Sequence, residues 1–193
     1  MSPANARTSN EAIIAAARVV LETGGPDAVT MRAVADAVGV RPPSLYKRVA
    51  DRSALLTAIA DSVAADLGEA TAPAADIPDP RRALRHMASR YRAFAHGAPR
   101  SYQLLFGAAG TQPSPSANAQ AAAGVLQVCQ ALVGPAQALD AARSLVAYVH
   151  GFVSMEIGGA FRLGGDVDAA FAYGIDTILA GLSPSDSRQA ARG

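Results

Sequence analysis

The chain has 193 residues, of which half are hydrophobic and 17% are charged, so it is long enough to bury a core and too apolar to be disordered. Alanine, which has the highest helix propensity, is the commonest residue and favours an all-α fold. The formal net charge of +1 excludes a globally basic protein that coats DNA. Any nucleic-acid binding must therefore come from a local patch.

The first three helices are predicted from capping and turn signals. The first helix begins at the Thr8-Ser9-Asn10-Glu11 capping box and ends at Gly24-Gly25-Pro26. Thr30 is a suitable N-cap for the second helix, which ends near Gly39. A short third helix is expected over residues 42–48.

The rest of the chain continues as helices separated by loops. Asp51 caps the fourth helix, and the small, acidic stretch 68–79 is predicted to be a linker. Asp79-Pro80 is a cap followed by a proline at the first helical position, which is a strong start signal. Residues 110–118 are expected to be a loop. The predicted helices are 52–67, 81–96, 101–106, 119–133, 136–161 and 167–182.

Residues 30–52 carry the most informative pattern in the chain. Small and apolar residues recur at the spacing of two helices that cross closely, with Gly39 at the turn. The inward set is Val34, Ala35, Val38, Val40 and Leu45. The outward residues of the second helix of this pair offer charge, hydroxyl groups and an aromatic ring, which are features of a major-groove reader. They are Arg41, Pro42, Pro43, Ser44, Tyr46, Lys47 and Arg48.

In this context the first 60 residues or so resemble the N-terminal domain of the tetracycline-repressor (TetR) family. The matching pieces are Gly24-Gly25, Thr30-Met31-Arg32, Ala35, Gly39-Val40, Ser44-Leu45-Tyr46, and Asp51-Arg52 through Leu55-Leu56. Further along, Tyr148-Val149-His150-Gly151-Phe152 is similar to the core of a C-terminal ligand domain named for a Trp-His-Gly motif. Tyr148 or Val149 stands near the tryptophan position of that motif.

The resemblance implies a homodimer that binds a near-palindromic double-stranded DNA operator and releases it when a small molecule binds. Residues 1–52 would be the helix-turn-helix DNA-binding domain, and residues 53–193 the helical ligand-binding and dimerisation domain. We expect the protein to repress transcription rather than to activate it.

The resemblance also assigns roles to residues of the N-terminal domain. Thr30, Tyr46 and Arg52 would contact phosphates. Base reading would depend on Arg41, Ser44 and Lys47, while Pro43 packs on a thymine methyl group. Val49 stands where the family usually has phenylalanine. The full set of expected DNA contacts is Thr30, Arg32, Arg41, Pro43, Ser44, Tyr46, Lys47, Arg48 and Arg52.

The two last long helices, 136–161 and 167–182, are the expected dimer surface. The first is apolar on two sides, so it needs two partners, such as its own core and another subunit. In the second, apolar residues repeat at helical spacing from Val167 to Leu182. The alternative is that both helices are core of a monomer.

A ligand site is suggested by bulky or polarisable residues in the body of the chain. Such residues are also typical of an ordinary core, and His150 is better explained as a core or interface histidine. If these residues line a site, its ligand is apolar or aromatic. They are Met87, Tyr91, Phe94, Tyr102, Phe106, Cys129, His150, Phe152 and Met155. The arginines Arg90, Arg92 and Arg100 are expected on a solvated face.

Other functional classes have less support. Cys129 is the only cysteine, which excludes a disulfide framework, and it lies in an apolar helix, where a thiol is usually inert. No known hydrolase, phosphate-loop or metalloprotease motif is present, so we predict that the protein is not an enzyme and has no metal or cofactor. No apolar run reaches the roughly 18 residues of a membrane span, and a cytoplasmic location follows. The remaining alternative is a helical protein–protein adaptor that has lost DNA binding.

Overall fold

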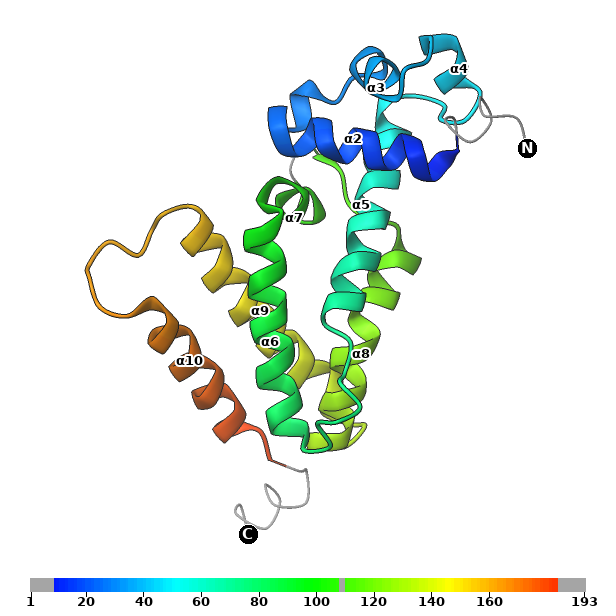
Figure 1. The fold of residues 1–193 in the computed structure, drawn as a ribbon. Coiled ribbons are helices and arrows are strands. Elements are labelled where there is room, and N and C mark those ends of the chain that lie inside the picture. Colours follow the sequence, from blue (N-terminus) through cyan, green and yellow to red (C-terminus); the bar gives the residue numbers. More distant parts are fainter. Residues whose placement is uncertain (1–8, 108–109, 184–193) are drawn as a thin grey trace. The chain divides into compact units, whose positions relative to one another are not determined.

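The computed structural model describes residues 9–107 and 110–183, and all regular elements in that part of the chain are helices (Figure 1). This confirms the all-α prediction. The elements are α2 (Asn10–Gly24), the 3-10 turn η1 (Pro26–Ala28), α3 (Met31–Val38), α4 (Pro42–Tyr46), α5 (Arg52–Ala70), α6 (Pro80–Gly97), α7 (Pro99–Leu105), α8 (Pro115–Val133), α9 (Ala138–Ile157) and α10 (Val167–Gly181).

The chain divides into two compact units. The first contains Met1–Asp66 and Gly97–Ala119, and the second contains Leu67–His96 and Gln120–Gly193. The predicted division after residue 52 falls inside the first unit. That unit also includes most of α5 and the segment 97–119, which carries α7 (Figure 1).

In the first unit, α2, α3 and α4 pack around a small apolar core. The fully buried core residues are Ile13, Ala17 and Leu21 of α2, Val34 and Ala35 of α3, and Leu45 of α4. Gly39 has φ 77°, the left-handed conformation that the predicted turn requires. Of the predicted inward set, Val34, Ala35 and Leu45 are therefore confirmed as core residues, whereas Val38 and Val40 are only half-buried.

The start of α2 differs from the prediction. Ser9, rather than Thr8, is the N-cap, because its hydroxyl oxygen accepts a hydrogen bond from the Ala12 amide at 3.1 Å. Thr8 lies outside the described residues. The predicted end is correct, since Gly25 at φ 79° stops the helix.

Three later helices have shifted bounds with local causes. α5 continues three residues into the predicted linker and ends at Ala70. α8 begins at Pro115 inside the predicted loop, because the Ser114 hydroxyl accepts from the Ala117 amide at 3.3 Å. α9 ends at Ile157, four residues before the predicted end, where Gly159 adopts φ 69°.

In the second unit, α9 and α10 approach closely at Gly174. A Cβ atom on Gly174 of α10 would collide with the hydroxyl group and ring of Tyr148 of α9. The Tyr148 hydroxyl group donates a hydrogen bond to the Phe171 carbonyl at 3.2 Å. The small residue at 174 therefore lets the tyrosine lie over the backbone of α10.

Candidate functional site

Helix α4 and the residues that flank it present the predicted DNA-reading side chains to solvent. Its two prolines occupy the first helical positions, where no amide proton is needed for the helix ladder. Leu45 is fully buried and anchors α4, so the opposite side of the helix faces outward. Arg41, Pro43, Tyr46, Lys47 and Arg48 are exposed, and Ser44 is half-buried.

Helix α3 adds two further predicted residues to the same unit. Thr30 is the N-cap of α3, because its hydroxyl oxygen accepts from the Ala33 amide at 3.1 Å. In this arrangement the hydroxyl proton can still donate to a phosphate oxygen. Arg32 is exposed in the first turn of α3.

Arg52 has a structural contact that the sequence prediction missed. Its Nε atom donates to the Val29 carbonyl at 2.8 Å, and one Nη atom donates to the Pro26 carbonyl at 2.6 Å. The guanidinium group therefore ties the start of α5 to the chain between α2 and α3. A phosphate contact from Arg52 stays a prediction.

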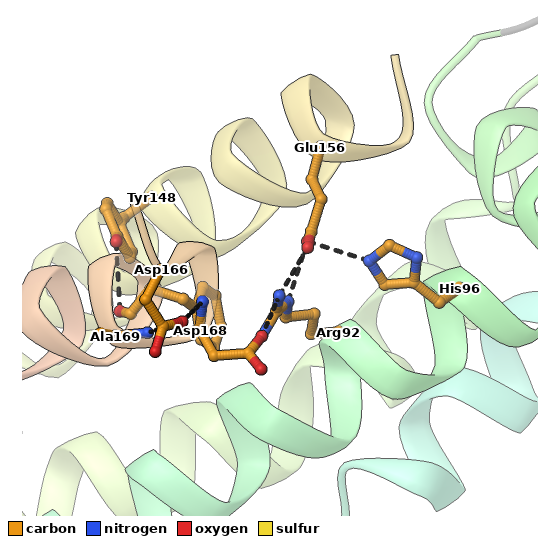
Figure 2. Close-up of polar contacts among 8 residues, drawn as sticks. Arg92, His96, Tyr148, Glu156, Asp166, Asp168 and Ala169 are labelled. Atoms are coloured by element: carbon orange, nitrogen blue, oxygen red, sulfur yellow. Dashed lines mark hydrogen bonds and ion pairs between the residues drawn. The ribbon is translucent and has the colours of Figure 1, made fainter. Parts of the chain in front are cut away.

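The second unit contains a polar cluster that joins α6, α9 and α10 (Figure 2). Arg92 of α6 donates to both Glu156 carboxylate oxygens of α9, at 2.8 and 2.5 Å, and pairs with Asp168 of α10 at 2.7 Å. The Nε2 atom of His96 lies 2.9 Å from Glu156. The side chains of Arg92 and Glu156 are only 18% and 16% exposed.

The charges in this cluster shift one another's titration. The hydrogen bond from Arg92 lowers the pKa of Glu156 to about 2, against the smaller opposing effect of burial. The same bond raises the pKa of Arg92 above its ordinary value. The expectation that Arg92 lies on a solvated face is wrong, because three helices surround its guanidinium group.

An aromatic cluster lies beside the polar one. The Phe152 ring is 4.6 Å from Phe161 and 5.2 Å from Phe171 between centroids, and Tyr148 is 5.8 Å from Phe152. The guanidinium carbon of Arg92 lies 5.0 Å from the centre of the Phe171 ring, which is a cation–π distance. The cluster joins α9, α10 and the loop between them.

The predicted ligand residues occupy different environments. Tyr102 and Phe106 belong to the first unit, where their rings are 5.1 Å apart. The other residues belong to the second unit: Met87, Tyr91 and Cys129 are buried, Phe94, His150 and Phe152 are half-buried, and Met155 is exposed. The structure brings Phe152 together with three aromatic residues that were not predicted as ligand contacts.

Burial changes the chemistry of two of these residues. It raises the pKa of the Cys129 thiol to about 11, which leaves the thiol protonated and unreactive near neutral pH. It lowers the pKa of His150, which favours the neutral imidazole. Neutral imidazole can accept or donate a hydrogen bond, and the His150 Nδ1 atom lies 3.5 Å from the Ser154 hydroxyl oxygen.

Sequence reasoning missed Glu156, Asp168, Phe161 and Phe171 as members of these clusters. The four-residue spacing of Tyr148 and Phe152 was a usable local signal. Arg92 and Glu156, in contrast, are 64 positions apart, and no pattern in one sequence pairs them.

Two classes of site receive no support in the part of the chain that the structure describes. Its His, Cys, Asp and Glu side chains do not assemble, three or more together, into a group that could hold a metal ion. Among the helices of residues 9–107 and 110–183, none combines the length and apolar character that crossing a membrane requires.

Comparison with known proteins agrees with this geometry. Residues 13–59 match the model of the bacterial regulatory proteins of the tetR family, and residues 84–178 match the tetracyclin repressor-like C-terminal domain. The chain is 30% identical over 185 residues to the uncharacterized HTH-type transcriptional regulator Rv0681 of Mycobacterium tuberculosis, covering 92% of this chain and 83% of the relative.

Solved structures show the same likeness. A TetR variant of Acinetobacter baumannii AYE, solved in complex with minocycline, is 28% identical with a TM-score of 0.68, over 90% of this chain and 95% of that one. A protein of unknown function from Rhodococcus sp. RHA1 is 25% identical with a TM-score of 0.75, over 89% and 93%. The chain therefore belongs to the TetR family of helix-turn-helix, DNA-binding transcriptional regulators, which are not enzymes.

Proposed function

We propose that this protein is a cytoplasmic, homodimeric repressor that a small apolar or aromatic molecule releases from a near-palindromic operator. Residues 1–52 read the DNA, and residues 53–193 bind the effector and the second subunit. The observation that carries the proposal is the exposed outer side of α4, where cationic, hydroxyl and aromatic side chains surround a helix anchored by buried Leu45.

Base reading is assigned to Arg41, Ser44 and Lys47. A good bidentate contact to a base contributes about 1–3 kcal/mol of discrimination, so one head with three such residues supplies about 3–9 kcal/mol at most. Two heads on one DNA molecule double the number of contacts and match the two halves of a palindrome. Dimerisation is therefore part of the function.

Large apolar side chains on α9 and α10 support self-association of the second unit. The core of the unit takes up Leu145, Val149 and Val153, which are nearly fully buried. Three others stay exposed on the two helices: Leu139 at 50%, Met155 at 52% and Tyr173 at 75%. A second copy would remove this apolar surface from water.

The effector is assigned to the second unit. Buried Met87, Tyr91 and Cys129 and half-buried His150 and Phe152 supply mostly apolar contacts, with the Tyr91 hydroxyl group and the His150 imidazole as polar groups. An apolar or aromatic molecule suits this composition. The effector and the operator then favour different conformations of the dimer. The binding of one weakens the binding of the other by the coupling free energy between the two sites.

The experiment is a titration of the purified protein on the DNA that flanks its own gene, at about 150 mM salt with excess non-specific competitor. We expect two chains per site, and we expect Arg41→Ala or Lys47→Ala to weaken binding by roughly tenfold or more. Arg82→Ala, which removes an exposed arginine of α6, is the matched control and leaves the affinity unchanged.

Two results would count against the proposal. If DNA selected from a random pool also shows no specific binding, the protein does not read DNA and the adaptor interpretation replaces it. If one chain binds per site with full affinity, dimerisation is not required for recognition.

A further inference from the structure

One side chain of α5 bonds to both ends of the stretch 26–29, which connects α2 to α3 within the first unit. η1 is a single 3-10 turn with Val29 as its C-cap, and carbonyl groups at the end of a helical turn need partners from outside it. The Pro26 carbonyl accepts from the Val29 amide at 3.2 Å and from an Nη atom of Arg52 at 2.6 Å. The Val29 carbonyl accepts from the Arg52 Nε atom at 2.8 Å.

This connection determines where and in which direction α3 begins. Thr30, the N-cap of α3, directly follows Val29, whose side chain is fully buried. A guanidinium group is planar and presents its N–H donors in a fixed fork, so two bonds from it fix direction as well as distance. α3 packs in turn against α4, which the base readers Arg41 and Lys47 flank. The bonds of Arg52 therefore bear on the placement of these readers.

The same geometry makes Arg52 a poor phosphate ligand. Its Nε atom and one Nη atom are already bonded to carbonyl groups. The exposed Asp27 carboxylate lies 3.9 Å from that Nη atom, and it offsets the positive charge that a phosphate would meet. Asp51, the preceding residue, adds a second carboxylate, which accepts from the Ala54 amide at 2.8 Å.

We propose that Arg52 is a positioning residue for base recognition, acting through its bonds to the Pro26 and Val29 carbonyls and not through a phosphate. This inference rests on the proposed function, because it concerns how the base readers assigned there are held. Phosphate contacts strengthen specific and non-specific binding alike, whereas contacts to base edges strengthen specific binding alone. A positioning role therefore has its own signature, which is a change in the ratio of the two affinities.

The test uses Arg52→Gln and Arg52→Lys in the full-length protein. Glutamine removes the charge, and lysine keeps it but offers one nitrogen atom in place of the fork. The control is Arg18→Gln, which removes an arginine of the same unit whose bonds go to Asp66 at 2.5 Å and Ser62 at 3.2 Å.

Two properties are measured well below the unfolding temperature of every variant. The first is the affinity for a duplex selected from a random pool and for a scrambled duplex of the same base composition, each at several salt concentrations. The second is hydrogen exchange, without DNA, in a peptide that covers residues 26–34.

We expect both Arg52 variants to bind the selected duplex about tenfold more weakly, since misplaced readers lose base contacts. Affinity for the scrambled duplex should stay within about twofold, and the salt dependence should be unchanged. Exchange in the peptide 26–34 should be faster in both variants. Arg18→Gln should leave the affinity ratio and this exchange as in wild type.

Three results would overturn the inference while the proposed function stands. Arg52→Gln could weaken both duplexes equally and lower the slope of log K against log salt by about 0.9 per subunit, which is the mark of a lost phosphate contact. Arg52→Lys could restore the wild-type ratio in full, which would show that the charge suffices. Arg18→Gln could lower the ratio as much as Arg52→Gln does, which would indicate a general loss of stability.

Unchanged exchange in the Arg52 variants would also overturn it, because the side chain would then not hold the connection. A wild-type protein that binds the selected and scrambled duplexes equally would remove the proposed function, and this inference with it.

Discussion

Cationic side chains in two regions of the molecule have different partners. In the first unit, Arg32 of α3 and the predicted base readers Arg41 and Lys47, which flank α4, are exposed to solvent. On α6 of the second unit, Arg81 donates to the Leu182 carbonyl at 2.7 Å, and Arg85 pairs with Asp176 at 2.5 Å. Arg92 completes the series within its polar cluster. Arg81, Arg85 and Arg92 of α6 bond to α10 or to the residue that follows it, whereas Arg41 and Lys47 on either side of α4 are exposed to solvent.

The comparison teaches that residue type alone does not separate the two roles. Arg32 of α3 and the arginines of α6, for example, all lie in helices that contain several alanines. The difference lies in whether another helix brings a carboxylate or carbonyl within reach. Four substitutions and one pH experiment follow, from the largest expected effect to the smallest.

Gly174→Ala should give the largest loss of stability. The new Cβ atom would collide with the Tyr148 ring and hydroxyl, so the tyrosine must leave its place over α10. We expect the free energy of unfolding to fall by about 3 kcal/mol in denaturant titrations. Gly181→Ala, where a Cβ atom meets nothing within 4 Å, is the control in the same helix. If the two variants are equally stable, the close approach of α9 and α10 is wrong.

Arg92→Ala should cost about 2 kcal/mol, because it leaves the poorly exposed Glu156 carboxylate without its main partner. Arg143→Ala removes an exposed arginine whose nearest carboxylate oxygen is 4.0 Å away, and it should change stability by less than about 0.5 kcal/mol. The same measurement distinguishes the two kinds of arginine. Equal effects would show that the cluster in Figure 2 contributes no more than a surface pair.

The pH dependence of stability should reveal the same cluster. Because the folded pKa of Glu156 is lowered to about 2, its contribution is fully present above the ordinary range of a glutamate. The contribution is lost as the pH falls from the ordinary pKa toward 2. Glu156→Gln should therefore flatten this part of the stability profile relative to wild type. An unchanged slope would mean that Glu156 is not ion-paired in the folded protein.

In the head, Thr30→Ala should reduce stability by about 1 kcal/mol, since it removes the side-chain cap of α3. Thr30→Ser keeps the hydroxyl group and should restore most of that loss. Thr23, whose hydroxyl donates to the Val19 carbonyl of its own helix, provides the matched alanine control with little effect. Thermal unfolding of the three variants ranks them. A loss for Thr23→Ala equal to that for Thr30→Ala would argue against the cap.

Cys129→Ser tests the smallest effect, which is one of reactivity. With a pKa of about 11, the native thiol should be labelled far more slowly than a free cysteine. Unfolding should raise the labelling rate to that of a free cysteine. The serine variant corrects for non-specific labelling. Fast labelling of the native protein would contradict the burial of Cys129 and revive a chemical role for it.

These experiments also mark what sequence can predict. The head could be predicted because its signals are local: Thr30 caps the helix that follows it, and Gly39 turns the chain three residues before α4 begins. The contacts of α6 could not, because Arg92 meets Glu156 only when two helices 64 positions apart pack together. Arg52 shows the limit inside the head, where a residue expected to hold phosphate also bonds to two backbone carbonyls.

The paired prolines at the start of α4 have a consequence for the range of sequences that the head can accept. Pro42 and Pro43 fix two φ angles before any DNA is met, so little backbone entropy remains to be lost on binding. A rigid element gains affinity for a target that fits it. It also adapts poorly to a mismatched one, because the backbone cannot adjust to recover lost contacts. We therefore expect this regulator to tolerate few substitutions in the bases that lie opposite α4.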